Sequence, residues 1–193
     1  MNKKFKEVYH SSKIHGLKTL IPHKSTHGEN WVYATWDIVM SAAFLGDLGG
    51  DFTCAVGRDT ETGKSYICER FKEAFDLRYN SVKGSIYVLP GDKFIVGKTQ
   101  WEEEVVCNET VIPLREIQVE NAKSYLIQLA KEDKLIIKYY PERIARIPED
   151  DEDLVFRAII WTKQFGDKIL EQVRKWHPNL LDRILQGIKE NKY

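Results

Sequence analysis

The chain has 193 residues, which suits one domain with an appended segment and allows an ordinary hydrophobic core. Hydrophobic residues make up 42% of the sequence and charged residues 30%, which excludes a largely disordered chain. Because 29 Lys and Arg balance 29 Asp and Glu, no net charge draws the protein to nucleic acid or to an anionic membrane.

The cysteines and the amino terminus indicate the compartment. Cys54, Cys68 and Cys107 are odd in number and lack CxxC spacing, which argues against a disulfide framework and against a structural zinc site. The first residues, MNKKFKEVYH, are basic but lack an apolar segment, and no stretch approaches the ~18 apolar residues of a membrane span. We therefore expect a cytoplasmic protein with no membrane partner.

The chain up to residue 119 consists of short segments rich in β-forming residues, separated by glycine, proline and charged turns. This pattern predicts a mainly antiparallel β structure. Two helices, near residues 36–45 and 70–77, are expected to interrupt it because both stretches lack internal glycine and proline. The predicted strands are FKEVYH, NWVYAT, FTCAVG, SYICER, SIYVLP, EEEVVC and LREIQV.

The stretch GRDTETGKS, residues 57–65, resembles a phosphate-binding loop but fails on spacing. Five residues separate Gly57 from Gly63, whereas the nucleotide-binding motif has four. Since FTCAV and KSYIC flank the stretch like paired strands, we expect a hairpin turn in which Gly63 supplies an unusual backbone conformation. Cys54 and Cys68 either face each other across this hairpin or are two separate buried side chains.

From residue 120 the pattern becomes helical. The segment VENAKSYLIQLAKED places apolar residues on one helical face. After the acidic run EDDED, which favours a helix start, LVFRAIIWTKQFGDKILEQVRKWHPNLLDRILQGIKE predicts two or three helices with a break at HPN, residues 177–179. We therefore expect a β-rich core over 1–119 and a mainly helical extension over 120–193 packed on it.

Three polar features of the first part are candidates for a site. His10 ends a strand and precedes two hydroxyl residues, Tyr33 ends a second strand, and the run Glu102 to Glu104 precedes two valines. Each also has an ordinary structural reading: a surface histidine, a half-buried aromatic ring and a solvated strand edge. Because strand side chains alternate, Glu102 and Glu104 are predicted on one face and Glu103 on the other.

In order and spacing these features resemble the ADP-ribosyltransferases that use NAD, in the branch with a histidine-tyrosine-glutamate signature. In its poly(ADP-ribose) polymerase group the histidine is followed by glycine and serine; here His10 is followed by Ser11 and Ser12. A tyrosine ends the next signature strand, as Tyr33 does here. The resemblance covers roughly residues 6–119, and it implies a split antiparallel β core with peripheral helices.

The spacing after the tyrosine is similar as well. The group has a serine eight residues on and a second tyrosine eleven residues on, where this chain has Ser41 and Phe44. Glu104 stands where the family has its catalytic glutamate. Glu102 falls where toxin-type members carry a glutamate or glutamine that positions an acceptor side chain. Ser11 in place of glycine and Phe44 in place of tyrosine are departures that concern the nicotinamide pocket.

The resemblance implies NAD as substrate and no metal. Tyr33 and Phe44 would form aromatic walls for the nicotinamide ring, and Ser41 and the backbone of Ser11 would hydrogen-bond its amide. His10 would hold a ribose hydroxyl. A fixed Glu104 carboxylate would stabilise the oxocarbenium-like ribose of the transition state.

The sequence thus predicts an α+β protein that transfers ADP-ribose, a glycosyltransferase reaction, to an unknown protein or nucleic-acid acceptor, or that hydrolyses NAD. Two alternatives stay open. One is an NAD-dependent RNA 2′-phosphotransferase, although no arginine cluster for an RNA phosphate precedes residue 119. The other is a catalytically inert domain that binds a nucleotide or a protein.

Overall fold

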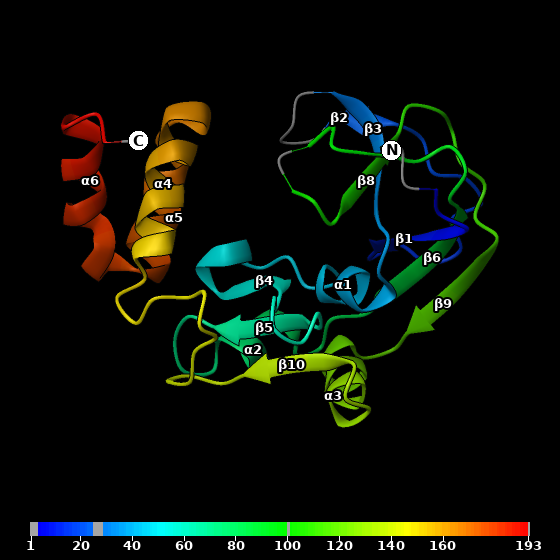
Figure 1. The fold of residues 1–193 in the computed structure, drawn as a ribbon, viewed down its shortest axis with the longest axis horizontal. Coiled ribbons are helices and arrows are strands. Elements are labelled where there is room, and N and C mark those ends of the chain that lie inside the picture. The colour runs from blue at the N-terminus through cyan, green and yellow to red at the C-terminus, as the bar shows by residue number, and fades with distance from the viewer. Residues whose placement is uncertain (1–3, 25–28, 100, 193) are drawn as a thin grey trace. The chain divides into compact units, whose positions relative to one another are not determined.

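The computed structural model describes residues 4–24, 29–99 and 101–192 (Figure 1). Within these ranges the chain combines helices with a seven-stranded and a three-stranded sheet, which confirms the predicted α+β class. It divides into two compact units: unit 1 is Met1–Gly46 with Tyr79–Leu135, and unit 2 is Asp47–Arg78 with Ile136–Tyr193. The predicted division into residues 1–119 and 120–193 does not follow the boundaries of these two units. That residues 1–119 form the catalytic core stays a prediction.

The sheet of unit 1 is antiparallel, with the order β7-β8-β3-β1-β6-β9 and with β2 paired to β3. Five of its strands confirm predicted segments, because β-branched and aromatic residues favour a pleated, half-buried surface. The two-residue strands β2 and β7 were not predicted. The strands are β1 (Glu7–Ser12), β2 (His23–Lys24), β3 (Asn30–Thr35), β6 (Gly84–Pro90), β7 (Ile95–Val96), β8 (Glu104–Cys107) and β9 (Arg115–Val119).

Strand β1 is held differently on its two sides. With β6 it pairs over six residue pairs, from Glu7 opposite Pro90 to Ser12 opposite Ser85. With β3 its register is set at Tyr9 opposite Thr35. One residue further along β1, the His10 imidazole connects β1 to β3, because its Nδ1 lies within hydrogen-bond distance, 2.6 Å, of the Tyr33 carbonyl oxygen. A side chain therefore joins the two strands next to the backbone pairing.

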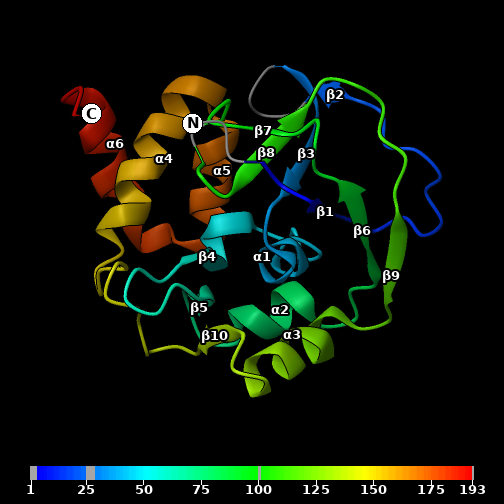
Figure 2. The same ribbon diagram turned by 45° about the vertical axis from the view of Figure 1, so that its right-hand side comes forward.

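Two helices of unit 1 confirm predictions. Helix α1 (Ile38–Ala43) begins where the Asp37 carboxylate accepts a hydrogen bond from the Val39 amide at 2.9 Å, which satisfies an otherwise unpaired donor of the first turn. It packs against β1, β3 and β6 (Figure 2). Helix α3 (Ala122–Lys131) is capped in the same way by Asn121. The sheet and α1 together place the ends of β1 and β3 against a helix.

Unit 2 contains the predicted hairpin. Strands β4 (Cys54–Arg58) and β5 (Ser65–Glu69) pair from Cys54 opposite Glu69 to Arg58 opposite Ser65, and β10 (Leu135–Lys138) completes the sheet. Gly63 has a φ of 69°, the left-handed conformation expected of it. Cys54 and Cys68 are free and buried, and each lies opposite another residue, so they are separate core side chains. Burial raises the pKa of the Cys54 thiol to about 12.

The helices of unit 2 follow the predicted pattern. Helix α5 ends at Trp176, and the HPN segment continues as a short 3-10 turn, which confirms the predicted break. Buried Leu154, Ala158, Val173 and Ile184 form part of a core between the helices. The helices are α2 (Ala74–Tyr79), α4 (Glu152–Phe165), α5 (Lys168–Trp176) and α6 (Leu181–Lys189), with 3-10 turns η1 (Gly50–Phe52) and η2 (Pro178–Leu180).

An ion-pair cluster lies at the start of α4. The Arg70 side chain is fully buried, and its guanidinium donates to Asp151 at 2.9 Å and to both Asp153 oxygens at 2.8 and 2.7 Å. Arg157 also donates to Asp153, at 2.7 Å. Burial alone would lower the pKa of Arg70, but the hydrogen bonds that it donates to Asp153 and Asp151 hold this pKa above its ordinary value. The acidic run therefore neutralises a buried cation as well as starting a helix.

Candidate functional site

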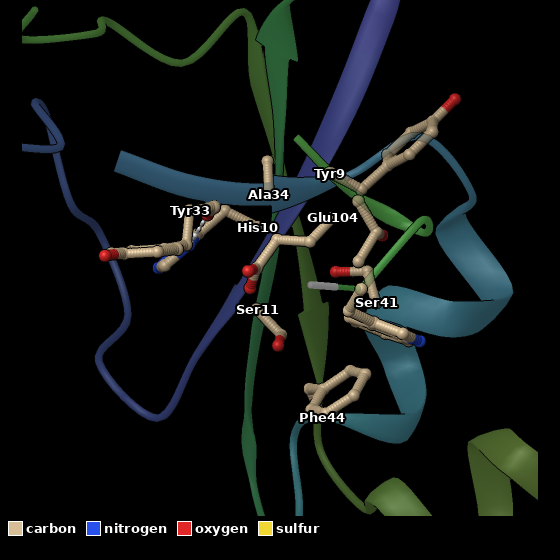
Figure 3. Close-up of a pocket in the computed structure, with 10 residues that line it drawn as sticks. Tyr9, His10, Ser11, Tyr33, Ala34, Ser41, Phe44 and Glu104 are labelled. Atoms are coloured by element: carbon tan, nitrogen blue, oxygen red, sulfur yellow. Dashed lines mark hydrogen bonds between the residues drawn. The ribbon is translucent and has the colours of Figure 1, made fainter. Parts of the chain in front are cut away.

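A cavity of about 200 Å³ opens in unit 1 where β1, β3, α1 and the start of β8 meet (Figure 3). It holds six of the eight residues that the sequence singled out. In the view of Figure 3 the Glu104 side chain extends toward Ser11, with Ser41 to the right of them and the Phe44 ring below. The residues that line the cavity are Tyr9, His10, Ser11, Tyr33, Ala34, Thr35, Ser41, Phe44, Trp101 and Glu104.

His10 is fixed by its bond to the Tyr33 carbonyl. A carbonyl oxygen can only accept, so Nδ1 carries the proton and donates it over 2.6 Å. Nε2 is then left as an acceptor. Burial lowers the pKa of His10 below its ordinary 6.5, and His23 lowers it further, while the Tyr33 bond opposes the shift. His10 is therefore a neutral imidazole at pH 7, with one nitrogen able to accept a hydrogen bond from a ligand hydroxyl.

We expect the imidazole resonances of His10 and His177 to titrate below pH 6.5. His177, in unit 2, donates from Nε2 to the Phe52 carbonyl at 2.6 Å, and burial likewise lowers its pKa. Since the unfolded chain then binds these protons first, the free energy of unfolding should fall as the pH drops from 6.5 toward the folded-state values. NMR titration, with resonances assigned from His10→Asn and His177→Asn, measures this directly, and a midpoint above 6.5 at either residue would contradict it.

The two serines after His10 have different surroundings. Ser11 lines the cavity. Ser12, the last residue of β1, lies outside the lining, and its Oγ accepts a hydrogen bond from the Ile14 amide at 3.1 Å. Ser11 is therefore placed to contact a ligand, whereas Ser12 has a local role in the turn that follows the strand.

Tyr33 and Phe44 are the two aromatic residues predicted for the cavity, and both line it. The Tyr33 hydroxyl donates to the Glu29 carbonyl at 3.0 Å, and its ring lies edge-on to His23 with the centroids 5.8 Å apart. Phe44 is 41% exposed, and its ring lies edge-on to that of Trp101 with the centroids 5.2 Å apart. Ring surface is therefore available on two sides of the cavity.

Ser41 is a buried polar residue of the site. It is 1% exposed, and its Oγ makes no hydrogen bond to any residue within the described ranges. A buried hydroxyl without a partner costs roughly 1–3 kcal/mol, so native proteins rarely keep one. Because Ser41 lines the cavity, a ligand with a polar group there would satisfy the hydroxyl.

Glu104 is the first residue of β8 and is half-buried. It lies opposite Thr35 of β3, and Thr35 lies opposite Tyr9 of β1. Residues directly opposite in antiparallel strands project to one face of the sheet. Tyr9, Thr35 and Glu104 therefore form a row on the face that lines the cavity.

The predicted alternation along the glutamate run is wrong for its first two members. Glu102 and Glu103 lie in a turn closed by the Glu104 amide on the Trp101 carbonyl at 3.1 Å, because the strand begins only at Glu104. Glu102 is exposed and does not line the cavity, and Glu103 is buried. The structure thus brings Glu104 to the other candidates and leaves Glu102 outside.

Sequence reasoning missed four lining residues: Tyr9, Ala34, Thr35 and Trp101. Tyr9 and Ala34 adjoin predicted site residues on their strands, so they could have been proposed from position alone. Trp101 directly precedes the glutamate run in QWEEEVV, and this large aromatic next to a candidate acid was a signal that could have been used.

No family model, curated protein or solved structure matches this chain. Within residues 4–24, 29–99 and 101–192, no group of three His, Cys, Asp or Glu side chains is arranged to hold a metal ion. In the same ranges no helix combines the length and apolar character needed to span a bilayer.

Proposed function

We propose that the protein cleaves NAD between nicotinamide and ribose and transfers ADP-ribose to an acceptor, or to water when no acceptor is present. One observation carries the proposal. Three motifs distant in sequence, at residues 10–11, 33–44 and 104, line one cavity, and they carry the residue types of the histidine-tyrosine-glutamate ADP-ribosyltransferases. The convergence supports the resemblance independently of the spacing that first suggested it.

The cavity suits the nicotinamide end of NAD. Its volume of about 200 Å³ is below the roughly 300 Å³ at which pockets begin to bury a drug-sized ligand. It would therefore take one ring and leave the remainder of the dinucleotide outside. Tyr33 and Phe44 would supply ring contacts, which are worth roughly 0.5–1.5 kcal/mol beyond area burial. The Ser41 hydroxyl would bond the carboxamide.

Two polar side chains of the cavity, His10 and Glu104, would act on the ribose. Neutral His10 would accept a hydrogen bond from a ribose hydroxyl at Nε2, because its Nδ1–H already donates a hydrogen bond to the Tyr33 carbonyl. The bond from ribose C1′ to the nicotinamide nitrogen breaks with its electron pair going to nicotinamide, which leaves neutral. The ribose becomes cationic at that moment, so the Glu104 carboxylate favours the transition state more than bound NAD. An acceptor lone pair then forms the new bond to C1′ and its proton is lost.

Chromatographic measurement of nicotinamide release from NAD tests this proposal. We expect release by the purified protein, and a rise in its thermal midpoint with millimolar NAD, as a ligand of the folded state requires. Release by the wild-type protein without a thermal shift would still support the reaction. Neither release nor a thermal shift would favour an inert binding domain. Removal of a 2′-phosphate from an RNA oligonucleotide would favour the phosphotransferase alternative.

We expect Ser41→Ala to weaken NAD binding without reducing stability. The variant removes a hydroxyl that has no partner in the described residues, so the free energy of unfolding should be unchanged or higher. The lost bond to the carboxamide should raise the Kd for NAD by roughly 2- to 13-fold, the equivalent of about 0.5–1.5 kcal/mol. Calorimetric titration and urea denaturation measure the two effects. Lower stability with unchanged NAD affinity would show that Ser41 is only a core residue.

A further inference from the structure

A second cavity, of about 530 Å³, lies wholly within unit 2. Four segments distant in sequence line it: residues 70–72 after β5, 140–143 after β10, 149–151 before α4, and 176–183 from the end of α5 into α6. All four are connections or element ends held by rigid strands and helices, which is where binding residues commonly occur. Its volume falls in the range of small-molecule sites.

Most of the charges in this cavity are already paired. Arg70 is neutralised by Asp151 and Asp153. The Arg143 guanidinium donates to the Glu69 and Arg70 carbonyls and lies 5.3 Å from the centre of the Tyr140 ring. Arg183 is paired with the carboxylates that flank the start of α4, donating to Asp150 at 3.2 Å. These cations therefore shape the walls and leave little positive charge for a ligand.

Three polar side chains of the lining stand apart from this network. In the part of the chain that the structure describes, the Lys72 ammonium, the Glu149 carboxylate and the Asn179 amide take part in no ion pair or hydrogen bond. Lys72 and Glu149 carry opposite charges and belong to different segments of the lining. A ligand that satisfies both has a carboxylate and an ammonium of its own.

The remaining wall is aromatic. The Trp176 and Phe71 rings are stacked, with their centroids 6.1 Å apart and their planes inclined by 14°. Buried His177 lies edge-on to Phe71, and its Nε2–H donates a hydrogen bond to the Phe52 carbonyl. The Lys175 ammonium lies 4.5 Å from the centre of the Trp176 ring, and the two rings contribute apolar surface to the same cavity as Lys72 and Glu149.

We propose that this cavity binds a short peptide with free ends, a di- or tripeptide zwitterion, with an apolar side chain against Trp176 and Phe71. Lys72 pairs with its carboxylate and Glu149 with its ammonium. A nucleotide fits less well, because Arg70, Arg143 and Arg183 are already paired, which leaves Lys72 as the one cation of the lining without a partner among the described residues. The proposal uses only unit 2 and is independent of NAD chemistry.

Calorimetric titration with the tripeptide Ala-Phe-Ala tests the chemistry of the ligand. We expect saturable binding of the peptide with free ends. The matched probe with an acetylated amino terminus and an amidated carboxyl terminus should bind at least roughly 10-fold more weakly, because it loses both charge-assisted hydrogen bonds. Equal binding of the two probes, or binding of neither, would overturn the proposal.

Variants locate the site. Lys72→Met and Glu149→Gln should each weaken peptide binding roughly 10-fold or more. Because both side chains are exposed and make no ion pair among the described residues, the thermal midpoint should not move. Lys189→Met and Glu61→Gln, in unit 2 but outside the cavity, are the matched controls and should bind the peptide as wild type does. Retained affinity in both cavity variants would place the peptide elsewhere and contradict the assignment.

Discussion

Replacement of Glu104 by Gln should lower the rate of nicotinamide release from NAD by about 10²-fold or more, while the Kd for NAD changes little. The variant keeps the size of the side chain and removes its charge. That charge acts chiefly when the ribose becomes cationic, so the loss appears in the chemical step. Single-turnover release and calorimetric titration separate the two effects.

The neighbouring Glu102 provides a matched control for Glu104. Glu102 is exposed in the turn before β8 and lies outside the cavity, so Glu102→Gln should hydrolyse NAD at the wild-type rate. If it affects transfer to an acceptor, that effect would identify the surface that meets the acceptor. A fall in hydrolysis caused by Glu102→Gln together with a normal rate for Glu104→Gln would show that Glu104 is not the catalytic carboxylate.

Arg70→Met should produce the largest loss of stability in unit 2. The substitution leaves Asp151 and Asp153 without the buried guanidinium that neutralises them, and breaking a buried pair from one side costs roughly 3–5 kcal/mol. Hydrogen exchange of the β4 and β5 amides reports the free energy of opening of this unit. It should fall by that amount in the variant.

Lys138→Met is the control for this prediction. It removes one partner of the Lys138–Glu142 pair, in which the two side chains are 36% and 67% exposed. An exposed pair contributes about 0–1 kcal/mol, so exchange in β4 and β5 should be nearly unchanged. Similar small effects for Arg70→Met and Lys138→Met would show that the buried cluster adds little to stability.

Much of the fold could be predicted because its signals are local. The strand formed by NWVYAT, the hairpin around Gly63 and the helix break at HPN each depend on neighbouring residues, through side-chain alternation, backbone freedom at glycine and the constraint from proline. The two-residue strands β2 and β7 carry no such pattern, since their pairing with β3 and β8 defines them.

The site could be predicted in part for the same reason. The spacing from Tyr33 to Ser41 and Phe44 spans one strand and one helix, so local structure brings them together. The row of Tyr9, Thr35 and Glu104 depends on register across three strands, and Glu102 was misplaced because the start of β8 depends on a turn. The Arg70 cluster joins residues more than 80 positions apart and left no local signal.

A crystal structure of the protein soaked with NAD tests the central claim most directly. We expect the nicotinamide ring in the cavity of unit 1 between Tyr33 and Phe44, with its carboxamide within about 3.2 Å of the Ser41 hydroxyl. The adjoining ribose should lie beside Glu104 and His10. Nicotinamide bound elsewhere, or a cavity without it at saturating NAD, would contradict the account.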